Sequence, residues 1–329
     1  MVWSPSLGPI HGELSGENAA EWQGLCSGVA GDWRNLHAGI TIGAVSVLHA
    51  KYARSHTMSW FKPRKKNKPE STASKEDGPL IAVVLLEADC FPMAALQKQI
   101  TEATICGRKT SEVKSDKGIL SCTLGDEMVY WAHMPAPYFW KFLEGPCATS
   151  WMWPKGMTAT EVVRPHKGHL LVTMIGGKAD RIRRRLLLTA LTAMAGQQAG
   201  VLGIYWPDST MVHYPKVFIE MAKDIKLPEA PPLYLWVDYR VFKNADGTFG
   251  MFTTGLSAIG YMEMEIPSVA MEPGELRQWG MNISYYLIEN GPVLEDGNTI
   301  GATEEAMFRI RHVPSSYGAQ GLVMRFVVE

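Results

Sequence analysis

The sequence predicts an α+β protein built mainly from antiparallel sheets with packed helices. Three observations support this fold class. Helical and strand patterns are mixed without the strict strand–helix–strand alternation of a parallel sheet. A two-residue Gly125-Asp126 turn between apolar segments is a strong hairpin signal. The segments 306–313 and 321–329 alternate apolar and polar residues, as half-buried antiparallel strands do.

The first half of the predicted core combines buried strands with two helices. Continuous apolar runs rich in valine and leucine predict buried strands, and Pro92 suits a helix start because its missing N–H needs no partner there. The order of elements is that of the ferredoxin-like split β-α-β arrangement. The predicted elements are a strand at 80–88, a helix from Phe91-Pro92 to about Ile105, strands at 118–124 and 127–134, a helix after Pro137 and a strand at 169–177.

The second half begins with the clearest helix of the chain, at 178–198. Ile182, Leu186, Ala190 and Met194 recur there at helical spacing. A later helix ends at Gly291-Pro292, a normal stop signal. The remaining elements are predicted as a strand at 200–206, a helix at 214–226, strands at 232–242, 248–255 and 259–266, a helix at 274–290 and the two final strands.

Composition shifts divide the chain into four parts. Residues 1–57 lack a sustained period and are expected to be a non-native or disordered extension, with Met58 as the natural start; a genuine N-terminal extension is the alternative. Residues 58–78 form a basic and polar spacer that cannot bury enough apolar surface to order itself, so they are expected to be a flexible leader. Residues 79–177 and 178–329 are predicted as two α+β subdomains packed as one unit.

The overall composition is that of a cytoplasmic globular protein. Hydrophobic residues make up 46% of the 329 residues, and the formal net charge of -1 argues against a dedicated nucleic-acid binder. No apolar run reaches the ~18 residues of a membrane span. The odd number of cysteines without a CxxC pair predicts reduced, mostly buried thiols. They are Cys26, Cys90, Cys106, Cys122 and Cys147.

Two glutamates stand one residue apart in the predicted strand IGYMEMEI. Tyr261, Glu263 and Glu265 would share one face of that strand, because successive side chains point to opposite sides. The simpler interpretation is the exposed face of a strand. The functional alternative is a groove in which two carboxylates act as acid and base or hold a cation.

Two histidines, His166 and His169, stand three residues apart before a buried strand. Such a pair can bind zinc, but a catalytic site needs a third ligand, which the sequence does not show. Histidines that position a loop at a strand start are the commoner case.

Positive charge is concentrated in the first turns of the helix at 178–198. Arg181 and Arg184, with the arginines at 183 and 185, oppose the helix dipole there, so nearby carboxylates of the same protein or an acidic partner are expected to compensate. Further on, Asp296 belongs to LEDGNTIG, a predicted tight turn.

Known catalytic and cofactor motifs are missing from the sequence. It contains no GxxxxGK[ST] phosphate loop, no GxGxxG after a strand, no HExxH and no GxSxG. No cofactor is therefore expected.

Several segments in order resemble the bacterial family catalogued as domain of unknown function 4261, over about residues 79–329. They include LIAVVLLE, WAHMPAP, HKGHLLVTMIGG, GVLGIYWPDS, PLYLWVDYRVF, TTGLSAIGYMEMEIP and LEDGNTIGATEEAMFRIRH. The resemblance implies a bacterial protein without an export signal. It brings no established activity, cofactor or site residue.

Two functions remain open from the sequence. The first is a non-enzymatic protein-binding module, in its concrete form an immunity protein whose partner is a toxin or secretion-associated protein, with no role for a membrane. The tryptophans, tyrosines and methionines suit interfaces as well as cores. The alternative is a hydrolase-type or metal-dependent enzyme with the histidine pair and the glutamate pair in one cleft. Nucleic-acid binding is third, because it rests only on the arginine run and the basic stretch at 64–68.

Overall fold

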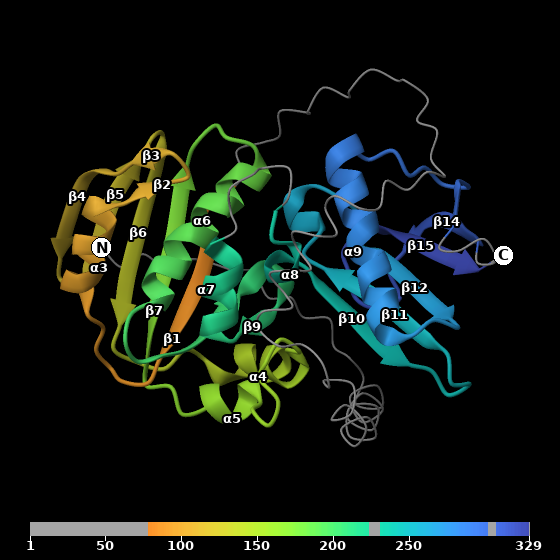
Figure 1. Ribbon diagram of the computed structural model, residues 1–329, viewed down its shortest axis with the longest axis horizontal. Coiled ribbons are helices and arrows are strands. Elements are labelled where there is room, and N and C mark those ends of the chain that lie inside the picture. Colours follow the sequence, from red (N-terminus) through yellow and green to blue (C-terminus); the bar gives the residue numbers. More distant parts are fainter. Residues whose placement is uncertain (1–77, 224–230, 302–306, 329) are drawn as a thin grey trace. The chain divides into compact units, whose positions relative to one another are not determined.

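The structure is a computed structural model that describes residues 78–223, 231–301 and 307–328, which fall within one compact unit of the chain, Leu48–Glu329. It confirms the α+β class, with mostly antiparallel sheets and packed helices (Figure 1). The predicted extension, the Met58 start and the leader up to residue 77 lie outside the described residues. Within the described ranges, no helix is long and apolar enough to cross a membrane.

The first sheet has seven strands in the order β4-β5-β6-β7-β1-β8-β9, and all its neighbours are antiparallel. The predicted hairpin is confirmed, because Leu124 pairs with Glu127 across the Gly125-Asp126 turn. The strands are β1 (Leu80–Leu86), β4 (Ser111–Asp116), β5 (Ile119–Leu124), β6 (Glu127–Met134), β7 (Gly168–Gly176), β8 (Val201–Trp206) and β9 (Met211–His213). A separate ribbon joins β2 (Thr104–Ile105) and β3 (Arg108–Lys109).

The strand order corrects the ferredoxin-like expectation. That arrangement would place β1 directly beside β6. In the structure β7 lies between them and pairs with both strands. The predicted elements occur in the expected order, although the strands between 104 and 116 and the helix at 159–163 were not predicted. The order along the chain does not determine which strands become neighbours.

Helices cover the two faces of the first sheet unequally. On one face α6 (Arg181–Gly196) packs on β1 and β7, with α3 (Met93–Glu102) and α7 (Pro215–Lys223) beside it (Figure 1). On the other face, α4 (Trp140–Thr149) and α5 (Ala159–Val163) cover the part formed by β1 and β8.

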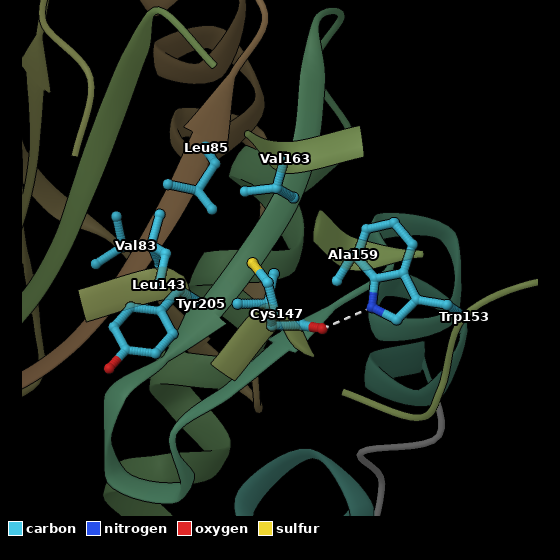
Figure 2. Packing of buried hydrophobic residues seen from close by; sticks show 9 residues of the cluster. Val83, Leu85, Leu143, Cys147, Trp153, Ala159, Val163 and Tyr205 are labelled. Carbon is cyan, nitrogen blue, oxygen red and sulfur yellow. Dashed lines mark hydrogen bonds between the residues drawn. The ribbon is translucent and has the colours of Figure 1, made fainter. Parts of the chain in front are cut away.

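A compact cluster holds α4 and α5 on the sheet (Figure 2). Val83 and Leu85 of β1 meet Leu143 and Cys147 of α4 there, and all four are almost fully buried. Burying a side chain of this size contributes about 1.5–3 kcal/mol. The Trp153 indole also donates a 2.8 Å hydrogen bond to the Val212 carbonyl, so this end of the face is closed.

The second sheet has six strands in the order β10-β11-β12-β15-β14-β13. β15 lies between β12, to which it is parallel, and β14, to which it is antiparallel. A long helix, α9 (Pro273–Asn290), packs on β10 and β11 (Figure 1). The strands are β10 (Asp238–Lys243), β11 (Phe249–Thr254), β12 (Met264–Val269), β13 (Thr299–Gly301), β14 (Met307–Pro314) and β15 (Leu322–Val328).

Two predicted strands of this half are shorter than expected. Residues 232–242 begin with a helical turn, α8 (Leu233–Trp236), because a buried apolar run suits a helix as well as a strand and Pro232 precedes it. The predicted strand 259–266 begins only at Met264, because Ser257–Ile259 form a 3₁₀ turn that ends at Gly260 with φ +97°.

The boundary between the two sheets lies later in the sequence than the predicted subdomain boundary at residue 178. Strands β8 and β9 follow residue 178 but pair within the first sheet.

The described cysteines are all free thiols, but fewer are buried than predicted. Cys122 and Cys147 are buried, whereas Cys90 and Cys106 are exposed because they lie in loops. Cys26 lies outside the described residues.

The buried histidine of β9 predicts an acid-sensitive fold. His213 is 1% exposed, and its Nε2 donates to the Leu235 carbonyl. Burial disfavours the charged ring and outweighs this hydrogen bond, which favours it. Burial lowers the pKa of His213 from 6.5 to about 4. A pKa below the unfolded value means that this stability is present above pH 6.5 and is lost as pH falls toward 4. Converted by linkage, the loss is about 3 kcal/mol.

Urea unfolding midpoints measured between pH 7 and pH 4 test this expectation. His213→Gln keeps a donor but cannot titrate, so its stability is expected to vary less over that interval. An equal decline in the variant and the wild type would contradict the assignment.

Candidate functional site

Glu263 is buried, and five donors of its own chain surround its carboxylate. The Thr253 hydroxyl lies 2.7 Å from Oε2 and the Leu256 amide 3.3 Å. Oε1 accepts from the Gly255 amide at 2.9 Å, the Ser257 amide at 2.9 Å and the Ser257 hydroxyl at 2.8 Å. The carboxylate therefore fixes the turn between β11 and β12.

The turn that Glu263 holds also requires a glycine. Gly255 has φ +118°, and a Cβ there would lie 2.2 Å from the Trp236 carbonyl oxygen. A side chain would clash with backbone, so only glycine allows this close approach. The interpretation of TTG as a turn before the glutamates is confirmed.

Glu265 is 1% exposed and anchors a second loop. Its Oε1 accepts from the Ser315 hydroxyl at 2.7 Å and the Ser316 amide at 2.9 Å. Its Oε2 accepts from Arg325 Nε at 3.1 Å and Nη2 at 2.8 Å. The loop between β14 and β15 is thus tied to the middle of the sheet.

The prediction that Glu263 and Glu265 lie on an exposed or groove-lining face of a strand is wrong. Glu263 is 6% exposed and precedes the strand, so the strand alternation does not apply to it. Glu265 does lie in β12, but the Ser315–Ser316 loop and Arg325 cover it. Tyr261 is half-buried, and burial raises its pKa. The two carboxylates serve as anchors for loops, and their oxygens are occupied by groups of the same chain.

The histidines position the segment before α4. His166 Nδ1 donates to the Val163 carbonyl at 2.8 Å, and its Nε2 accepts from the Tyr138 amide at 2.8 Å. His169 Nδ1 donates to the Ala136 carbonyl at 2.8 Å, and burial lowers the pKa of His169. In the described ranges, no group of three His, Cys, Asp or Glu side chains is placed to hold a metal ion.

The histidine pair and the glutamate pair do not form one site. The histidines belong to β7 and the loop before it in the first sheet, whereas the glutamates hold loops of the second sheet. They share no hydrogen-bond partner in the described contacts.

The arginine run of α6 finds carboxylates of the same chain, as its simpler interpretation predicted. Arg184 Nε lies 3.4 Å from Glu127 Oε1, and this pair is almost completely buried. Arg185 Nη2 lies 2.8 Å from Asp208 Oδ2. Arg183 pairs with the N-cap residue, Asp180, at 3.4 Å. Glu127 was not predicted as important, because nothing in EMVYWAHM distinguishes it from an exposed first residue of a strand.

Two other predicted residues lie at the start of α6 and in a turn. Arg181 reaches the loop that Glu263 holds, with its Nη1 3.3 Å from the point where a Cβ on Gly260 would stand. Asp296 Oδ1 accepts from the His312 amide at 2.7 Å, and Gly297 has φ +82°, so the predicted tight turn is confirmed.

The feature that the sequence interpretation missed is an uncovered apolar area on the first sheet. Five of its residues are between 39% and 47% exposed although they are large and apolar. Met128 and Ile175 are direct cross-strand neighbours, and Ile119 pairs with Ala132 on the same face. The five are Ile81, Ile119, Met128, Met134 and Ile175.

Two phenylalanines of the α4 region extend this area. Phe139 is 72% exposed and Phe142 51%, and their rings meet edge to face with centroids 6.3 Å apart. Tyr138 connects them to the sheet, because its ring contacts both Phe142 and His169, and His169 pairs with Met134. We call these seven apolar residues, the five of the sheet with Phe139 and Phe142, the open-face patch. The available signal in the sequence was that the strand at 127–134 carries apolar side chains on both of its faces, although only one face can point into the core that α6 covers.

Comparison with known proteins gives one finding. A family described as a domain of unknown function (DUF4261) matches residues 252–327, the segment from β11 to β15. Neither the curated proteins nor the solved structures contain a match to the chain. The resemblance predicted from the sequence is thus confirmed over residues 252–327, and over residues 79–251 it stays a prediction.

Proposed function

We propose that the protein is a protein-binding module whose binding surface is the open-face patch. The observation that supports this function is the exposure of seven large apolar side chains on adjoining strands and at the start of α4. The largest contiguous apolar area on a folded chain is often a functional surface, whereas single exposed apolar residues are common and need no explanation. Aromatic and methionine side chains are also enriched in protein interfaces.

The enzyme alternative has no comparable observation in its favour. Its proposed groups are His166, His169, Glu263 and Glu265, and each is engaged by its own chain. The narrower function of an immunity protein that binds a toxin stays a prediction from the sequence.

A capture experiment with the full chain tests the proposed function. Met128→Lys/Ile175→Lys places two charges on one cross-strand pair of the patch, and Leu322→Lys changes a similarly exposed residue of the second sheet. The wild type and the Leu322→Lys control are expected to retain the same bound protein. The double variant is expected to bind it at least about tenfold more weakly, because burying an unpaired charge costs more than 1.4 kcal/mol.

Circular dichroism and the unfolding midpoint must first show that both variants remain folded. Equal capture by the double variant and the control would contradict the proposed function.

A further inference from the structure

We propose that the partner of the open-face patch is the same patch on a second copy of this chain, which makes the protein a two-fold symmetric dimer. This inference rests on the proposed function and names its partner. Three properties of the patch support a self-complementary contact: its regular surface, the charges at its ends and its area.

The surface of the patch is a regular sheet face. Cross-strand pairs place its side chains in rows, with Met128 beside Ile175 and Ile81 beside Thr173, which in turn pairs with Tyr130. Two such faces pack about 10 Å apart with interdigitated side chains, as in a β-sandwich. Phe139 and Phe142 stand at one border of the area, where they can meet the sheet of the other copy.

Charge at the ends of the patch favours contact with a copy of itself. Asp116 and Lys117 are exposed at the turn that enters β5, and Asp126 and Lys178 are exposed beyond its opposite end. Lys178 and Asp126 are also linked, since the Lys178 amide donates to Asp126 Oδ2 at 2.8 Å. In a two-fold symmetric dimer, the Asp116–Lys117 end of one copy lies against either the same end or the Asp126–Lys178 end of the other copy.

Either orientation can place an acidic residue opposite a basic one, because each end carries one of each. A patch with one sign of charge at both ends would instead repel its copy.

The apolar area of the patch is about two-thirds of what one partner of a standard interface contributes, which suits a weak dimer. Burying a large apolar side chain contributes about 1.5–3 kcal/mol, which at about 25 cal/mol per Å² corresponds to about 60–120 Å² of apolar area. Seven side chains, each roughly half exposed, then present roughly 300 Å². One partner of a standard interface contributes about 800 Å², of which about 450 Å² is apolar. The half-buried Tyr130, Ala132 and Leu171 lie between the seven and add to this area.

Sedimentation equilibrium of the full chain tests the dimer. The wild type and the Leu322→Lys control are expected to form dimers at concentrations up to about 100 μM, above the micromolar Kd of a weak dimer. Met128→Lys/Ile175→Lys is expected to be monomeric or to dissociate at least about tenfold more readily. Hydroxyl-radical oxidation of the exposed Met128 side chain, compared at low and high concentration, reports whether the open-face patch is the contact.

Each other outcome overturns the dimer. A dimer unchanged in the double variant would place the contact elsewhere. A monomeric wild type would also overturn it, and the proposed function would still stand if capture of a different protein is lost in the double variant. A monomer without patch-dependent capture would remove both. A monomer whose Met128 side chain resists oxidation at every concentration would assign the face to another segment of the same chain.

Discussion

Replacing Glu263 with glutamine is expected to lower the free energy of unfolding by about 3–5 kcal/mol. The amide nitrogen of glutamine is a donor, so it would face hydrogen-bond donors that now point at a carboxylate oxygen. Gly255, Leu256 and Ser257 offer three backbone amides, and two hydroxyls complete the set. Each buried donor left without an acceptor costs about 1–3 kcal/mol. The measurement is the urea unfolding midpoint together with its slope.

A matched control separates the effect of Glu263 from a general change of charge. Glu289→Gln removes an exposed glutamate of α9 and is expected to change stability by less than about 0.5 kcal/mol. Hydrogen exchange should show faster exchange of the Gly255, Leu256 and Ser257 amides in the Glu263 variant. Unchanged protection of these amides would show that the carboxylate does not hold the turn.

Replacing Arg184 with methionine is expected to cost about 3–5 kcal/mol, because it leaves the Glu127 carboxylate buried without its ion-pair partner. The Glu127 side chain is 0% exposed and that of Arg184 is 2% exposed. Burial raises the pKa of Glu127, and Arg184 lowers it in part. Loss of the arginine therefore raises that pKa further, which makes the variant less stable as pH rises above about 4.5, where the unfolded carboxyl ionises.

The double variant Glu127→Leu/Arg184→Met provides the control for this pair. It removes both charges, so its stability is expected to lie within about 1 kcal/mol of the wild type and to lose the pH dependence of the single variant. The unfolding midpoints of the wild type and of both variants, measured at pH 5 and pH 8, test this expectation. An additive loss in the double variant would mean that the two residues are not energetically coupled.

The sequence was sufficient for elements whose pattern is local. The apolar run of β1, the helical spacing of α6 and the Gly125-Asp126 turn each reflect neighbours within a few residues, and the structure confirms all three. Strand order was not predictable in this way. The place of β7 between β1 and β6 depends on pairing between distant segments, which no local period contains.

The same limit explains the candidate site. The period of two placed Glu263 and Glu265 on one polar side of a strand, but their burial comes from the loop at 315–316 and from the turn at 253–257. A carboxylate that is satisfied by distant donors has the same sequence signature as one in water. The open-face patch was missed because an apolar residue in a strand is normally predicted to be buried in the core, and the sequence does not show which sheet face stays exposed.

The position of β15 has a consequence for how the protein is made. This strand is the last of the second sheet to leave the ribosome, yet it lies in the interior, between β12 and β14. Until it emerges, the β10–β11–β12 meander and the β13–β14 hairpin each present an unpaired strand edge, which is the state most prone to aggregation during synthesis. Its arrival pairs Arg325 with Glu265 and closes both edges in one late step. The second sheet is therefore most open to edge-to-edge aggregation just before β15 pairs.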